Sequence, residues 1–177
     1  MDEEGKGSED RITEIIIKYF YNIAENSESF SIDKDAIKFD FFISKVKFRC
    51  QTKKGLQYKL PNGFMIEHEA DIVITRNENI VDPYVLNPSN KFVSIEIKHK
   101  SAVTDAFKSR AYDMMHLRKE YPLCLGVMIY IREGNITIER AEQYCYPYQQ
   151  FFGCTTNELT EEKISPIFNE IVSYLKE

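Results

Sequence analysis

The sequence predicts an α/β fold in which a central mixed β-sheet of about five strands is flanked by helices on both faces. Helix-like and strand-like apolar patterns alternate along the chain, which is typical of this class. A continuous apolar run over residues 123–131 indicates a buried central strand. Apolar residues make up 43% of the 177 residues, enough for one core. We therefore expect a short flexible lead-in over residues 1–8 and a single domain over residues 9–177.

The first part of the chain predicts one helix and then an ambiguous stretch. Apolar residues recur every three or four positions over residues 9–25, which indicates an amphipathic helix. Residues 32–50 allow two interpretations. Ser31 is a suitable cap for a second helix, whereas residues 45–50 alternate between polar and apolar as a strand does.

The pattern is clearer in the rest of the chain. Strands are predicted at residues 56–60, 64–75 and 92–100, separated by Gly, Pro and Asn-rich turns. Apolar residues at helical spacing predict a helix that ends at Pro122. After the central strand, residues 135–144 are interpreted as another strand. Thr160 is expected to cap a final helix.

Cysteine usage indicates a protein of a reducing compartment, and hydropathy gives no membrane-spanning segment. The four cysteines include no Cys-x-x-Cys pair and the three histidines are scattered, so the spacing gives no support to a zinc site. No apolar run approaches the roughly 18 residues that span a membrane. We expect reduced thiols and a cytoplasmic location.

Charge is distributed unevenly along a chain whose net charge is −5. Residues 41–66 contain no acidic residue, and together with later positions they supply candidate phosphate-binding side chains. These candidates are Lys45, Lys47, Arg49, Lys53, Lys54, Lys100, Lys108 and Arg110. A solvated basic surface without a nucleic-acid role is the alternative interpretation.

The candidate active site comes from two predicted strands that form a hairpin. Side chains alternate along a strand, so Glu69 and Asp71 share one face of the first strand, and Glu96 and Lys98 share one face of the second. If the connecting loop is centred near Asp82-Pro83, Asp71 falls about opposite Glu96. Carboxylates and an ammonium group would then meet in one patch.

This patch has the groups that metal-assisted phosphodiester hydrolysis requires. Mg²⁺, for which Mn²⁺ can substitute, prefers oxygen ligands and keeps several waters, so two carboxylates suffice. A neighbouring lysine can orient or deprotonate the attacking water, or stabilise developing negative charge. The Glu-x-Lys triplet alone is weak, because it also occurs at Glu4-Gly-Lys6 and Glu161-Glu-Lys163. Only the copy at 96–98 lies on an apolar-backed strand; the alternative is a half-buried sheet that shows charges to solvent.

Ala70-Asp71 followed by Glu96-Ile-Lys98, in a helix–three strands–helix–strand order, resembles the PD-(D/E)XK nuclease superfamily. This superfamily includes type II restriction endonucleases, Holliday-junction resolvases and RecB-like nucleases. The resemblance spans residues 9–145 and implies a restriction endonuclease-like αβββαβ core. It differs from the family pattern in two places. Ala70 replaces the proline, and Lys108-Ser-Arg-Ala-Tyr112 has lysine where RecB-like members have glutamine.

The resemblance implies roles for individual residues. Asp71, Glu96 and the backbone carbonyl of Ile97 would bind the metal, and Lys98 would be the catalytic lysine. Many members add a glutamate from the first helix, for which Glu14 is a better candidate than Glu9 because it lies mid-helix. Glu69 is a further candidate ligand.

We therefore expect an Mg²⁺-dependent endonuclease of restriction-enzyme type that acts on double-stranded DNA, with RNA left open. Enzymes of this type commonly work as homodimers, which cut both strands by symmetry. Two other interpretations remain: a non-catalytic nucleic-acid-binding module, or a protein-interaction module, on the same fold.

Overall fold

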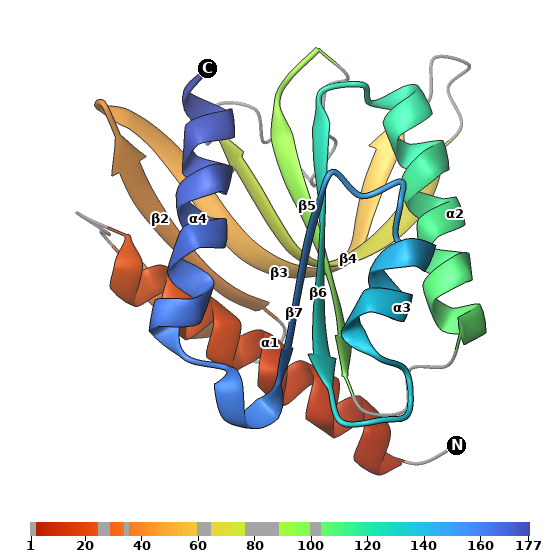
Figure 1. Ribbon diagram of the computed structural model, residues 1–177. Helices are drawn as coiled ribbons and strands as arrows, with labels where there is room; N and C mark the ends of the chain where they lie inside the picture. Colours follow the sequence, from red (N-terminus) through yellow and green to blue (C-terminus); the bar gives the residue numbers. More distant parts are fainter. Residues whose placement is uncertain (1–2, 25–28, 34–35, 60–64, 77–88, 100–103) are drawn as a thin grey trace.

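A computed structural model of the chain describes residues 3–24, 29–33, 36–59, 65–76, 89–99 and 104–177. Side chains are described for residues 9–24, 39–52, 70–76, 89–99 and 104–177. The predicted class is confirmed: the chain is an α/β protein with a mixed sheet and helices on both faces (Figure 1).

In the described part of the chain, seven strands form one sheet in which spatial order follows chain order, so the prediction of about five strands was too low. The strands are β1 (Ser29–Asp33), β2 (Ala36–Ile43), β3 (Val46–Lys59), β4 (Met65–Arg76), β5 (Phe92–His99), β6 (Cys124–Arg132) and β7 (Gln150–Thr155). Neighbours from β1 to β5 are antiparallel, whereas β5, β6 and β7 are parallel. The strand predicted to be buried and central is β6. It is buried along almost its whole length, but it lies next to the edge strand β7 and not at the centre of the sheet.

The helices cover the two faces of the sheet in pairs (Figure 1). On one face, α1 (Glu3–Ile23) and α4 (Glu161–Lys176) enclose the larger apolar core. On the other face, α2 (Thr104–Glu120) and α3 (Ile138–Tyr144) enclose a second core. We call these the α1/α4 core and the α2/α3 core. Within the described residues, no helix is both long enough and apolar enough to cross a membrane.

The last helix of the chain begins where the sequence predicts, but the first helix does not. Thr160 caps α4 as predicted, since its hydroxyl accepts a hydrogen bond from the Lys163 backbone N–H. In contrast, α1 begins at Glu3, so it includes most of the segment predicted to be a lead-in.

The ambiguous stretch over residues 32–50 is made of strands and contains no second helix in its described part. A two-residue turn joins β2 to β3, with positive φ at both Ser44 (50°) and Lys45 (69°). Positive φ at both central residues is the requirement of a type I′ hairpin turn, whose twist matches that of the flanking strands. Of the separate strand predicted at residues 56–60, residues 56–59 are the end of the long β3, and residue 60 lies outside the described residues.

The predicted strand over residues 135–144 is wrong, because residues 138–144 form α3. The polar–apolar alternation there covers only a few residues. The pattern that decides the structure is helical: Ile138, Ala141 and Cys145 lie three and four residues apart and all pack in or against the α2/α3 core. Thr137 caps the helix by accepting a hydrogen bond from the Arg140 backbone N–H at 3.2 Å. The sequence prediction also missed β7.

Candidate active site

The hairpin that carries the candidate site forms as predicted. β4 pairs with β5 from Ile72↔Ile95 to Thr75↔Phe92. One further step along this register places Asp71 opposite Glu96, as the sequence analysis predicts. The site therefore lies where the β4–β5 ladder ends.

A shift of register on the other side of β4 sets the direction of Asp71. β3 pairs with β4 at Thr52↔Ile72 and then at Lys53↔Ala70, so Asp71 is an extra residue without a partner on β3. Such a bulge re-aims the side chain of the extra residue. It also reverses the alternation: Ile72 lies in the α1/α4 core, but Ala70 lies in the α2/α3 core. Simple alternation along β4 would place Ala70 and Ile72 on one face, and the bulge is the reason that they lie on opposite faces.

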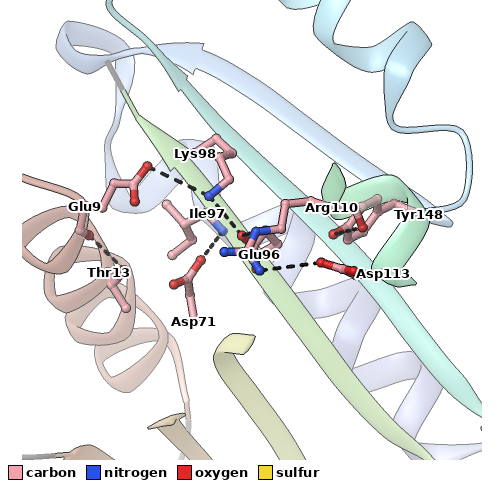
Figure 2. A network of polar contacts seen from close by, with 9 residues as sticks. All are labelled: Glu9, Thr13, Asp71, Glu96, Ile97, Lys98, Arg110, Asp113 and Tyr148. Carbon is pink, nitrogen blue, oxygen red and sulfur yellow. Dashed lines mark hydrogen bonds and ion pairs between the residues drawn. The ribbon is translucent and has the colours of Figure 1, made fainter. Parts of the chain in front are cut away.

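The re-aimed carboxylate of Asp71 reaches the backbone of β5. Its Oδ2 accepts a hydrogen bond from the backbone N–H of Ile97 at 2.6 Å (Figure 2). The N–H and C=O of one residue point to the same edge of a strand. The carbonyl of Ile97, a predicted metal ligand, therefore faces the same edge of β5 as Asp71.

Glu96 and Lys98 alternate with Ile95 and Ile97, whose side chains lie in the α1/α4 core. Both charged residues are buried, with relative exposures of 3% for Glu96 and 8% for Lys98. Lys98 Nζ lies 3.0 Å from Glu96 Oε1. A charged sheet face turned to solvent, the alternative interpretation, does not describe these two residues.

The first helix contributes a glutamate to the site, but it is Glu9 and not Glu14. Glu9 Oε1 lies 4.0 Å from Lys98 Nζ (Figure 2). Glu14 is exposed. At 3.6 residues per turn, five residues turn the helix by roughly 140°, so the two glutamates cannot face the same neighbour. Buried Thr13 follows Glu9 by four residues and its hydroxyl donates to the Glu9 carbonyl, which marks the helix face that meets the sheet.

Two residues of the site were assigned differently or missed by the sequence analysis. Arg110 of α2, predicted as a phosphate ligand, donates from Nε to Glu96 Oε1 at 2.9 Å and lies 3.7 Å from Asp113. The buried Tyr148 donates its hydroxyl proton to the Arg110 carbonyl at 3.2 Å. The sequence contains a signal for Arg110, which stands three residues after buried Phe107 and four before buried Met114. For Tyr148 we find no such signal, because it follows the misassigned α3.

The electrostatics of the site are dominated by negative charge withdrawn from water. Burial, followed by the charge of Glu96, raises the pKa of Asp71 from 3.8 to about 7, although the Ile97 N–H and Lys98 act in the opposite direction. Burial also raises the pKa of Glu96, against the opposing effects of Lys98 and Arg110. Burial lowers the pKa of Arg110, but the charges of Glu96, Asp113 and Asp71 together outweigh burial, and the net direction is upward.

The chemistry of the donors fits an oxygen-coordinated divalent cation. The contacts above engage one oxygen of each carboxylate, Asp71 Oδ2 and Glu96 Oε1. They leave the second oxygens, with the Ile97 carbonyl, as ligands. Among residues whose side chains are described, no three Asp, Glu, His or Cys side chains converge as a metal-binding group. Mg²⁺ does not require a third, because it is usually held by one or two carboxylates and waters.

Apart from Arg110, the predicted phosphate-binding residues fall into three groups. Lys47 and Arg49 alternate with Phe48 and Cys50, whose side chains lie in the α1/α4 core, so the two basic residues lie on the same sheet face as Glu96. Both form ion pairs with Asp40: Lys47 Nζ lies 3.1 Å from Oδ2, and Arg49 Nε lies 2.9 Å from Oδ1. Two others are exposed: Lys45 at the β2–β3 turn, and Lys108, whose Nζ lies 5.4 Å from the Tyr144 ring centre. The remaining candidates fall outside the described side chains, as does the candidate ligand Glu69; they are Lys53, Lys54 and Lys100.

His99 is buried at the end of β5, and its Nε2 lies 3.3 Å from Glu133 Oε1. All four cysteines are buried and unpaired.

Comparison of this chain with protein-family models, with curated proteins and with solved structures finds no match.

Proposed function

We propose that the protein is a divalent-metal-dependent nuclease of the PD-(D/E)XK type that cleaves double-stranded DNA. One observation carries the proposal. The end of the β4–β5 ladder and the bulge at Asp71 bring this carboxylate beside the buried Glu96 and Lys98, which lie 25 or more residues further along the chain. Two carboxylates beside one lysine are the groups that metal-assisted phosphodiester hydrolysis needs.

The order of elements supports the same proposal. The sequence α1, β3, β4, β5, α2, β6 matches the αβββαβ order that the resemblance implies. In this interpretation β1 and β2 extend the sheet at one edge and β7 extends it at the other, while α3 and α4 pack on its two faces. Glu9 of α1 then takes the position of the glutamate that many members contribute from their first helix.

Each residue has a role that follows from its position. Asp71 Oδ1, Glu96 Oε2 and the Ile97 carbonyl would hold Mg²⁺. When bound, this ion would lower the pKa of a coordinated water and neutralise charge on the phosphate. Lys98 is held by Glu96 and Glu9 next to this position. It would orient the attacking water or stabilise the charge that develops on the phosphate oxygens.

The substrate is inferred from the sheet face on which Glu96 lies. Lys47 and Arg49 of β3 lie on the same face, with β4 between their strand and β5. Basic side chains on that face suit contact with a phosphate backbone. A homodimer would present two such sites to the two strands of a duplex.

Cleavage of plasmid and oligonucleotide DNA with Mg²⁺ or Mn²⁺ tests the proposal. We expect Lys98→Ala to lower the cleavage rate by at least about a hundredfold, the range typical of a lost acid–base or charge-stabilising group. Lys163→Ala is the matched control, because it removes the exposed lysine of Glu161-Glu-Lys163 on α4, which is the other Glu-x-Lys triplet whose side chains are described. If Lys98→Ala cuts as fast as wild type, or if wild type cuts neither DNA nor RNA, the proposal is wrong.

A specific observation also favours a second candidate, a non-catalytic nucleic-acid-binding module. Lys98 and Arg110 both lie within 3.0 Å of Glu96 Oε1 and compensate the charge of this carboxylate. Calorimetric titration with Mn²⁺ separates the two candidates. A catalytic site binds Mn²⁺ in wild type and not in Asp71→Asn, whereas the binding module shows no such difference.

A further inference from the structure

Glu96 is contacted by two cations at the same oxygen. Lys98 Nζ lies 3.0 Å and Arg110 Nε 2.9 Å from Oε1 (Figure 2). The two cations are not equivalent. The side chain of Lys98 is 10% exposed and comes from the same strand as Glu96, whereas that of Arg110 is 32% exposed and comes from α2. Arg110 is therefore the partner that can leave Glu96 for a position in solvent.

The backbone of Arg110 is held in place by packing, whereas its side chain is partly exposed. The Tyr148 hydroxyl donates a hydrogen bond to the Arg110 backbone carbonyl. On the same helix, Ala111 is buried and Met114 is buried in the α2/α3 core. Asp113, one turn further along α2, lies 3.7 Å from Arg110 Nη1 and is partly exposed. Asp113 offers a second carboxylate on the solvent side of Glu96. A change of partner thus needs only rotation of the side chain and no movement of the helix.

We propose that Arg110 is a phosphate ligand for nucleic acid that is released from Glu96 when a divalent cation binds. This inference rests on the proposed function, because it needs a metal at Asp71 and Glu96. A dication on Glu96 repels the guanidinium group by like charge. The released group carries a planar fork of N–H donors that matches the oxygens of a phosphate, which lysine lacks.

Two opposite effects of Arg110 on binding follow. Without nucleic acid, Arg110 competes with the metal for Glu96 and weakens metal binding. With metal bound, Arg110 is available for phosphate and strengthens nucleic-acid binding. Binding of metal and of nucleic acid is then positively coupled through one side chain, and linkage makes this coupling equal in both directions.

Titration calorimetry with Mn²⁺ alone tests the first effect. Arg110→Gln removes the competing charge, and we expect it to bind Mn²⁺ at least about fivefold more tightly than wild type, the lower end of typical coupling. Arg110→Lys keeps a cation near Glu96 and should bind Mn²⁺ as wild type does. Lys119→Gln is the matched control, since Lys119 is an exposed cation near the end of the same helix.

Binding of a fluorescein-labelled DNA duplex tests the second effect. Ca²⁺ serves as the oxygen-ligated cation, and a gel verifies that the duplex stays intact. Adding Ca²⁺ should strengthen duplex binding by wild type and by Lys119→Gln. Arg110→Gln and Arg110→Lys should lose most of this gain. For Arg110→Gln, the slope of log affinity against log salt should fall by about one phosphate contact.

The outcomes distinguish this inference from the proposed function. If wild type binds no Mn²⁺, both are overturned and Arg110 is only a structural partner of Glu96. If wild type binds Mn²⁺ but Arg110→Gln shows the same Mn²⁺ affinity and the same gain in duplex binding, only the role of Arg110 is overturned. Arg110→Lys keeps the test decisive if the glutamine variant does not fold.

Discussion

Replacement of Asp71 by asparagine should stabilise the protein, by an amount that depends on pH. The pKa of Asp71 is about 7 in the folded protein against an ordinary value of 3.8. Between these values the folded protein holds a proton that the unfolded chain has lost. Stability therefore falls as pH rises through this interval and falls no further above about 7. The asparagine variant has no such dependence at this position, and its side-chain oxygen can still accept the hydrogen bond from Ile97.

The magnitude follows from the interval between the two pKa values. At 1.36 kcal/mol for each pH unit, the wild type loses up to about 4 kcal/mol between pH 4 and 7 through this one group. The difference in unfolding free energy between Asp71→Asn and wild type should grow by up to that amount over the same range and then stay constant. Glu96 titrates in both proteins, so most of its contribution cancels in the difference.

Urea unfolding at a series of pH values between 4 and 8 measures this difference. Asp10→Asn on the exposed surface of α1 is the control and should stay parallel to wild type at every pH. Added Mn²⁺ at pH 8 should stabilise the wild type and leave Asp71→Asn unchanged, because a bound ligand stabilises only the state that binds it. A gap between Asp71→Asn and wild type that does not change between pH 4 and 7 would refute the reasoning.

Two further predictions follow from the structure. Gly126→Ala should lower the unfolding free energy by about 1 to 3 kcal/mol in urea titrations, because the added Cβ would lie 2.5 Å from Met114 Sδ in the α2/α3 core; an unchanged midpoint would mean that Met114 adapts freely. Glu9→Gln should weaken Mn²⁺ binding measured by calorimetry and should slow cleavage, whereas the exposed Glu14→Gln should alter neither. Equal effects of the two variants would contradict the assignment of Glu9 to the site.

The sequence predicted the site where alternation along one strand was enough. Glu96 and Lys98 share a face because they are two residues apart on β5, and Asp71 faces Glu96 because the hairpin register is symmetric about its loop. Asp71 reaches β5, however, through a bulge, and a bulge depends on how β3 pairs with β4 rather than on local pattern. For the same reason, the reversed side of Ala70 was not predictable from alternation.

The errors in the helices have a related cause. Glu9 and Glu14 are both compatible with a helix beside a sheet, and only the packing of α1 on the sheet decides which one meets Lys98. Residues 135–144 were predicted wrongly because two isoleucines alternate there, while the cap at Thr137 and the spacing of Ala141 and Cys145 decide for a helix. Local pattern identified long segments such as α2 and β6, whereas over the short α3 the alternation of two isoleucines competed with the helical spacing.

The arrangement around Glu96 also has a cost that bears on its role. Removing carboxylates from water is expensive, and buried ion pairs seldom recover the whole penalty, so an apolar replacement of similar volume is often at least as stable. Here Glu96 is buried beside Asp71. Burial is the main cause of the raised pKa of both carboxylates, and the charge of Glu96 raises the pKa of Asp71 further. Lys98 and Arg110 compensate only Glu96 at short range. Two mutually repelling carboxylates of this kind contribute little to folding and are better suited to binding a cation that relieves the repulsion.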